Sequence, residues 1–212
     1  VYKRQDVSEA VKDYNAIRDA VGDNIFLILD SSQNWKNPKA VINAFSNIYD
    51  PNLAIEQPVH FLDLDTSAQI AKSIDIPVIL DESVFSPERV LEIARKGAAD
   101  AVHIKIGRVG GIYEGLRAEA IAEAAKIPVR TETMHETRVY DTANAHYSLT
   151  VRNLFHPGFS GYFYPVVDIV KSGGISHKGP LVNVPDLPGL GIELDESIVR
   201  KYAITSTLQA SS

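Results

Sequence analysis

The chain contains no cysteine, and it has only one methionine and one tryptophan among its 212 residues. The absence of cysteine excludes disulfide bonds, thiolate nucleophiles and zinc–thiolate sites, and it leaves the redox compartment undecided. No run of about 18 apolar residues is present, so we expect no membrane-spanning helix. No basic and apolar leader opens the chain, and we therefore take the cytoplasm as the default location.

The chain also lacks an excess of positive charge. It has 21 Lys and Arg against 27 Asp and Glu, which gives a formal net charge of -6 at pH 7. This balance argues against nucleic acid and anionic membranes as partners. No HExxH metal pattern, Walker motif or GxSxG hydrolase motif is present, so the common signatures of these classes are missing.

Four apolar runs are present, and each ends in a polar residue. The runs IFLILD, NLAIE, PVILD and AVHIK end at Asp30, Glu56, Asp81 and Lys105, at intervals of 26, 25 and 24 residues. This interval is the length of one strand and one returning helix with short loops. A single polar residue at a strand end is usually a helix cap, but caps need no constant spacing. The regular spacing therefore favours one shared site.

Apolar periodicity and the Pro, Gly and Asn punctuation predict an alternation of helices and strands. The expected helices cover 6–21, 37–49, 65–73, 86–97, 112–126 and 137–150; the expected strands cover 25–30, 53–56, 78–81, 101–106 and a segment from 129. Such alternation predicts an α/β fold with a parallel sheet of the TIM-barrel type. We expect one partial barrel domain over 1–212, with regular repeats over 1–152 and the last strand region and a C-terminal extension over 153–212.

A barrel of parallel strands carries its active site at the carboxyl ends of those strands. The three carboxylates and the amine should therefore meet at one rim. Three acidic oxygen donors predict a Mg²⁺ site that Mn²⁺ could also fill, and the nearby lysine predicts an acid–base group. Because side chains alternate along a strand, His103 should point inward one layer below Lys105. It is either a satisfied interior residue or a catalyst.

Several other polar residues and glycines near these strand ends are candidates for the site. Glu82 could hold Lys105, or it could be a solvated loop carboxylate. Gly110, in the glycine-rich turn IGRVGGI, could help to bind a substrate carboxylate at a helix N-terminus, or it could serve only a tight turn. His135 and Glu136 follow the fifth expected strand and could line the pocket.

These motifs together resemble the enolase superfamily. IFLILDSSQNW, LAIEQP and PVILDES resemble the segments that carry its three metal-binding carboxylates, and HIKIGRVGGI resembles the strand with a catalytic lysine. The pairing of DES with IK is similar to the muconate-lactonizing subgroup. Within that subgroup, IKIGRVGG and MHETR are most similar to o-succinylbenzoate synthases and N-acylamino acid racemases, and dipeptide epimerases are close competitors.

The resemblance implies a (β/α)7β barrel whose capping domain and first two strands are not in this chain. It implies that Asp30, Glu56 and Asp81 bind Mg²⁺ and that Lys105 is a general acid or base. The reaction would remove a proton α to a carboxylate through a metal-stabilised enediolate. Ser32, which stands where many relatives have Asn, is expected near the substrate or the ligands. The implied partners are a small carboxylate substrate and further copies of the chain in a homo-oligomer.

One departure from the superfamily pattern keeps several functions open. The opposing lysine of the superfamily would fall at or just before Val1, and Lys3 is expected to lie in a loop. The alternatives are a two-base racemase or epimerase, a one-base lyase, and a muconate cycloisomerase-like enzyme. From another class, a non-catalytic or truncated barrel could only bind a carboxylate ligand, and a phosphate-binding barrel could use the turn at 107–111.

Overall fold

The computed structural model describes residues 2–3, 6–134, 136–156, 158, 165 and 167–203. The chain divides into two compact units. The first unit comprises Val1–Glu132 and Thr150–Gly158, and the second comprises Thr133–Leu149 and Phe159–Ser212. The expectation of one domain over 1–212 stays a prediction, and each unit is described by itself.

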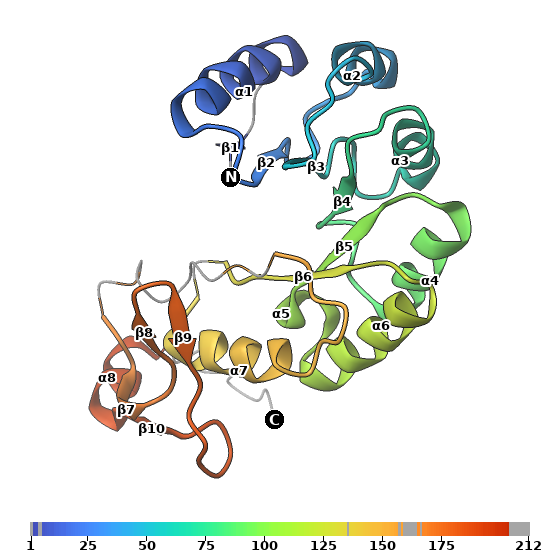
Figure 1. Ribbon diagram of the computed structural model, residues 1–212. Coiled ribbons are helices and arrows are strands. Elements are labelled where there is room, and N and C mark those ends of the chain that lie inside the picture. Colours follow the sequence, from blue (N-terminus) through green and yellow to red (C-terminus); the bar gives the residue numbers. More distant parts are fainter. Residues whose placement is uncertain are drawn as a thin grey trace, which may run out of the picture. The chain divides into compact units, whose positions relative to one another are not determined.

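A six-stranded sheet in sequence order forms the centre of the first unit, and each strand pairs in parallel with the next. Its strands are β1 (Tyr2–Lys3), β2 (Leu27–Asp30), β3 (Leu53–Glu56), β4 (Val78–Leu80), β5 (Ala101–Ile104) and β6 (Val129–Thr131). The helices between them are α1 (Val7–Val21), α2 (Pro38–Phe45), α3 (Leu64–Ala71), α4 (Pro87–Lys96), α5 (Ile106–Val109) and α6 (Ile112–Ala124). Helices α1, α2, α3, α4 and α6 contact one another in that order along the sheet (Figure 1). The α/β barrel-type fold predicted from the sequence is confirmed.

Capping residues set the helix boundaries close to where the sequence predicts them. The side chain of Ser86 accepts a hydrogen bond from the N–H of Arg89, and Pro87 occupies the first helical position of α4. Pro has no N–H to satisfy there and its φ suits the first turn. Gly97 ends α4 with a φ of +60°, a left-handed conformation that costs glycine little.

The structure corrects two details of the predicted elements. The strand expected over 101–106 ends at Ile104, and the one-turn helix α5 follows, with the N–H groups of Arg108 and Val109 bonded to the carbonyl of Lys105. The chain thus turns directly after Lys105. The loop expected at Lys3 is instead the end of β1, and the β1–β2 register pairs Lys3 with Asp30.

Alternation along the strands separates two apolar layers. One cluster joins the outward-facing strand residues to the helices; its members include Leu29, Leu53, Ile55, Val78, Val41, Phe45 and Ile70. A second cluster on the other face consists of Ile28, Ala54, Ile79 and Ala101, with Phe26 and Phe155 packed against it. The polar residues Asp30, Glu56, Asp81 and His103 each follow a member of this second cluster by two residues. The inner face therefore changes from apolar to ionisable toward the carboxyl ends of the strands.

The second unit contains one long helix and four short strands. Its elements are α7 (Arg138–Ser148), β7 (Val170–Gly173), β8 (Ser176–Lys178), β9 (Leu181–Asn183), β10 (Ile192–Leu194) and α8 (Glu196–Tyr202). Both strand pairs, β7 with β10 and β8 with β9, are antiparallel. Thr142 on α7 accepts a hydrogen bond from the N–H of buried Ile175 at 3.0 Å, which fixes this helix against the chain after β7. Among the described residues, no helix has the length and apolar character needed to cross a bilayer.

Gln57 joins the ends of β3 and β4. Its fully buried side chain accepts hydrogen bonds from the N–H groups of Asp81 (2.9 Å) and Ser83 (3.1 Å) through Oε1. Its Nε2 donates to the carbonyl of Val59 (3.0 Å) and to the hydroxyl of Ser83 (2.9 Å). Both the oxygen and the nitrogen of the Gln57 amide are thus hydrogen-bonded. Gln57 therefore holds the chain that follows β3 next to the chain that follows β4.

Arg18 and Asp50 form a largely buried ion pair under the first helix. The guanidinium of Arg18 donates to Oδ2 of Asp50 at 2.7 and 3.0 Å, and the hydroxyl of Tyr14 donates to the same oxygen at 2.8 Å. Burial alone would raise the pKa of Asp50, but the hydrogen bonds from Tyr14, the Asn52 N–H and Arg18 hold this pKa below its usual value. The cluster ties α1 to the chain that enters β3.

The first prediction concerns Gln57. Gln57→Leu keeps most of the side-chain volume but leaves several buried donors and acceptors unpaired. We expect it to lower the free energy of unfolding by about 3 kcal/mol, since each orphaned buried group costs about 1–3 kcal/mol. Urea unfolding measures the change. The matched control is Gln69→Leu at an exposed position of α3, and an equally large loss in that variant would contradict the assigned role.

The second prediction concerns Asp50 and pH. Asp50→Asn should lower the free energy of unfolding at pH 7 by about 2–3 kcal/mol, because it weakens hydrogen bonds to a charged and largely buried group. The folded pKa of Asp50 is depressed. Its contribution is therefore complete above about pH 4 and is lost as the pH falls through the folded pKa.

Urea unfolding of both proteins at successively lower pH tests this reasoning. The difference between wild type and Asp50→Asn should shrink in acid. Asp65→Asn removes the exposed carboxylate partner of Lys96, and it should change stability little at any pH, as is usual for surface pairs. A difference between wild type and Asp50→Asn that is independent of pH would show that the charge of Asp50 is not what stabilises this region.

Candidate functional site

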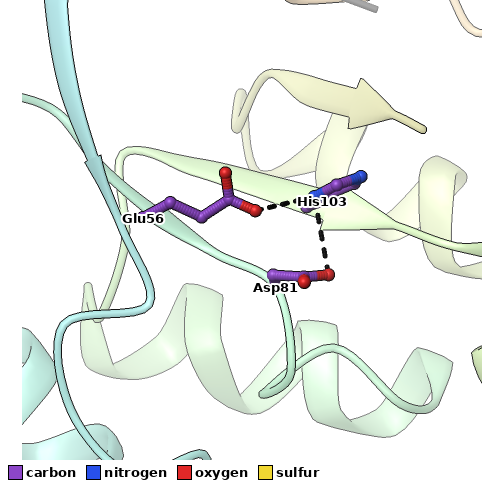
Figure 2. A group of neighbouring side chains, drawn as sticks. All are labelled: Glu56, Asp81 and His103. Carbon is purple, nitrogen blue, oxygen red and sulfur yellow. Dashed lines mark hydrogen bonds and ion pairs between the residues drawn. The ribbon is translucent and has the colours of Figure 1, made fainter. Parts of the chain in front are cut away.

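Three buried side chains from neighbouring strands meet in the first unit. Glu56 ends β3, Asp81 follows β4, and His103 lies on β5. Their possible ligand atoms all lie within 4.8 Å of one another. Figure 2 shows the carboxylates of Glu56 and Asp81 both directed toward the ring of His103. The structure brings together two of the carboxylates predicted as metal ligands, Glu56 and Asp81; their role as ligands stays a prediction, and the sequence left the role of His103 open.

His103 contacts both carboxylates through one ring nitrogen. Nδ1 lies 2.9 Å from Oε1 of Glu56 and 3.5 Å from Oδ1 of Asp81, and the ring is fully buried. A carboxylate oxygen accepts, so the shorter contact is a hydrogen bond in the tautomer that carries a proton on Nδ1. Nε2 lies 3.7 Å from Oε2 of Glu132, which is an electrostatic contact beyond hydrogen-bond length.

Asp81 is the most heavily contacted carboxylate of the group. Lys105 donates from Nζ to Oδ2 at 2.8 Å. Arg108 donates to Oδ1 at 2.6 Å and to the backbone carbonyl of Asp81 at 2.7 Å. Burial alone would raise the pKa of Asp81, but the positive charges of His103, Lys105 and Arg108 hold it well below its usual range. Asp81 is therefore an ionised oxygen donor at neutral pH.

Asp30 lies next to this group on the adjacent strand. Its backbone is directly opposite Glu56 in the β2–β3 register, and its side chain is buried. Oδ1 of Asp30 accepts hydrogen bonds from the N–H (2.7 Å) and the hydroxyl (3.1 Å) of Ser32. The close group of possible ligand atoms found among the described residues does not include Asp30. That Asp30, Glu56 and Asp81 bind one ion stays a prediction.

The structure also describes Glu82, Gly110 and Glu136 among the predicted site residues. Burial and the negative charges of Asp81 and Asp30 raise the pKa of Glu82, and a contact from Glu82 to Lys105 stays a prediction. Gly110 ends α5 with a φ of +107°. Glycine adopts this backbone conformation readily because it has no side chain. Glu136 belongs to the second unit. His135 lies outside the described residues.

The donor set of the first unit fits a divalent cation. Oε2 of Glu56 is buried and has no hydrogen-bond partner among the described residues. A buried carboxylate oxygen left without a partner is costly unless a cation satisfies it. Carboxylate oxygens are the ligands that Mg²⁺ and Mn²⁺ prefer. Glu56 and Asp81, with Asp30 beside them, are the residues that would hold such an ion.

Sequence analysis overlooked three charged residues near this site. Arg108 follows Lys105 by three residues, and it reaches Asp81 because α5 turns the chain at that point. Arg130 and Glu132 lie at the end of β6, where the register pairs His103 with Arg130. The same two-residue alternation that placed His103 and Lys105 on the inner face also places Arg130 and Glu132 there. Arg130 and Glu132 thus repeat on β6 the two-residue pattern of His103 and Lys105 on β5.

Comparisons with known proteins agree with this architecture. A family model described as "Enolase C-terminal domain-like" matches residues 2–198. The L-Ala-D/L-Glu epimerase of Bacillus subtilis is 33% identical over 89% of this chain and 52% of its own length. The N-succinyl-L-Arg/Lys racemase of Bacillus cereus is 31% identical over 93% of this chain and 53% of its own, and its crystal structure superposes with a TM-score of 0.85 over 95% of this chain and 56% of that structure.

A third relative was solved with ligands. The dipeptide epimerase of Enterococcus faecalis, in complex with Mg and the dipeptide L-Leu-L-Tyr, is 32% identical with a TM-score of 0.82 over 90% of this chain and 55% of that structure. Muconate cycloisomerases match as well, at 30% identity for the Pseudomonas putida enzyme. The chain spans about half the length of the curated relatives it matches. The matched family model covers nearly all of the chain, and the chain belongs to the enolase C-terminal domain-like family within the enolase superfamily.

Proposed function

We propose that the protein is a Mg²⁺-dependent racemase or epimerase that removes the proton α to the carboxylate of an N-acylated amino acid or dipeptide. The observation that carries the proposal is the buried amine of Lys105, 2.8 Å from a carboxylate of the candidate cation group. An amine there can exchange a proton with a substrate bound at the same rim. The racemase and epimerase names of the relatives support this reaction class.

The proposed reaction assigns a separate task to each side chain. A bound Mg²⁺ would supply positive charge next to a substrate carboxylate and so stabilise negative charge that develops when the α-proton leaves. Glu56 and Asp81, with Asp30, hold the ion. Lys105 removes the α-proton from one face of the substrate, or delivers a proton to that face, and a second acid–base group acts at the opposite face. Arg108 keeps two bonds to Asp81, so Asp81 stays in place when Lys105 turns from it to the substrate.

Three alternatives follow from the same site. An o-succinylbenzoate synthase-type lyase needs only one acid–base group, whereas racemisation needs a group on each face of the substrate. A muconate cycloisomerase-like reaction has support from the muconate relatives. A non-catalytic barrel would bind a carboxylate ligand without proton exchange. Incubation with N-succinyl amino acids, dipeptides and muconate in D2O, followed by NMR, separates them by deuterium uptake, inversion and elimination.

The third prediction concerns Asp81 as a cation ligand. Asp81→Asn removes one negative charge from the group, and we expect it to abolish measurable Mg²⁺ binding in calorimetry and to abolish turnover. The matched control is Asp19→Asn on an exposed part of α1, which should bind Mg²⁺ as the wild type does. Normal turnover by Asp81→Asn, or no Mg²⁺ binding by the wild type, would reject the proposed function.

The fourth prediction separates chemistry from cation binding. Lys105→Met removes the amine, and we expect solvent deuterium exchange at the α-carbon to fall at least about 100-fold, the usual contribution of a positioned acid–base group. Mg²⁺ affinity should stay the same or rise, because a cation that competes for Asp81 is gone. Lys12→Met, at an exposed position of α1, should leave both quantities unchanged. Full exchange by Lys105→Met would remove Lys105 from the chemistry.

A further inference from the structure

His103 contacts the carboxylate of Glu56 through its ring nitrogen Nδ1. Nδ1 lies 2.9 Å from Oε1 of Glu56, in a site where both side chains are almost fully buried. The second oxygen of that carboxylate, Oε2, is the one without a hydrogen-bond partner among the described residues. The two oxygens of Glu56 therefore differ: one is engaged by His103, and the other is available to a cation.

The contact between Nδ1 and Glu56 also bears on whether His103 is a ligand. A histidine binds a metal ion through an unprotonated ring nitrogen. Nδ1 is the nitrogen next to Glu56 and Asp81, and it lies at hydrogen-bond distance from Oε1 of Glu56. The nitrogen that faces the two carboxylates is thus already in contact with one of them.

An ion pair between buried Arg130 and half-buried Glu132 lies near the other nitrogen of the ring. Arg130 lies 2.9 Å from Oε2 of Glu132, and the same oxygen lies 3.7 Å from Nε2 of His103. Arg130 also donates to the carbonyl of His156 at 2.7 Å. A Cβ at Gly158 would come within 2.9 Å of Glu132, so the backbone closes this side of the pair. Glu132 thus lies near the ring nitrogen of His103 that does not face Glu56.

We propose that His103 is a positioning residue for the cation site: it holds Oε1 of Glu56 so that Oε2 faces the ion, and it is not a ligand. The inference rests on the proposed function, because it presumes that a divalent cation binds at Glu56 and Asp81. It predicts an all-oxygen site. It also predicts that an amide, which can present an N–H at the same distance from the backbone as Nδ1, replaces His103 in part.

The fifth prediction tests the positioning role by calorimetry with Mg²⁺ and with Mn²⁺. His103→Leu should weaken binding of both ions about 10- to 100-fold, the usual effect of removing a group that orients a ligand. His103→Asn should recover a measurable part of that loss. His60→Asn, at an exposed loop position, is the matched control and should bind both ions normally. Thermal unfolding in EDTA shows whether each variant is folded.

A second measurement uses the wild type and does not depend on any variant folding. Electron spin echo modulation of the Mn²⁺ complex detects a directly bound imidazole nitrogen, and we expect no such coupling. Detection of that nitrogen would overturn the inference while leaving the proposed function standing, as would unchanged ion affinity in folded His103→Leu. A wild type that binds neither Mg²⁺ nor Mn²⁺ would reject the proposed function and the inference together.

Discussion

Repulsion between buried carboxylates is the constraint on which the rest of this structure depends. Glu56 and Asp81 come together in a part of the barrel with little exposure to water, where two negative charges cannot lie close without positive charge beside them. Lys105, Arg108 and His103 supply that charge from the next strand and the turn that follows it. A bound cation would supply more. The geometry that makes the site costly without cations is what would give it affinity for one.

The fold gathers these charges through a simple feature of parallel strands. Adjacent strands end at one edge, and every second residue faces the same side. Ile79 and Asp81, two residues apart, therefore place an apolar side chain below an ionisable one, and Ala101 and His103 do the same on the next strand. The apolar layer excludes water from below, which strengthens the electrostatic contacts above it. The hydrogen bonds of Gln57 to Asp81 and Ser83 then fix the ends of β3 and β4 relative to each other.

The sequence predicted those parts of the site that depend on chain spacing. The strand ends at Asp30, Glu56 and Asp81 follow from apolar runs of regular length, and the helix start at Ser86 and Pro87 follows from capping. It did not predict α5, because Gly107 and the two glycines after it suggested a loop where the carbonyl of Lys105 in fact begins a helical turn. The contacts of Arg108 depend on that turn, so periodicity alone could not reveal them.

The arrangement around Asp81 would let one lysine serve both structure and the proposed chemistry. A lysine that neutralised Asp81 alone could not leave it without exposing a buried charge, and its motion would be opposed by that cost. Here Arg108 binds the other oxygen and the carbonyl of the same residue, and His103 lies 3.5 Å away. The carboxylate thus keeps two cationic or donor neighbours when Lys105 turns away. The amine of Lys105 is therefore the cationic group whose departure from Asp81 the site tolerates best, as the proton transfer proposed for it requires.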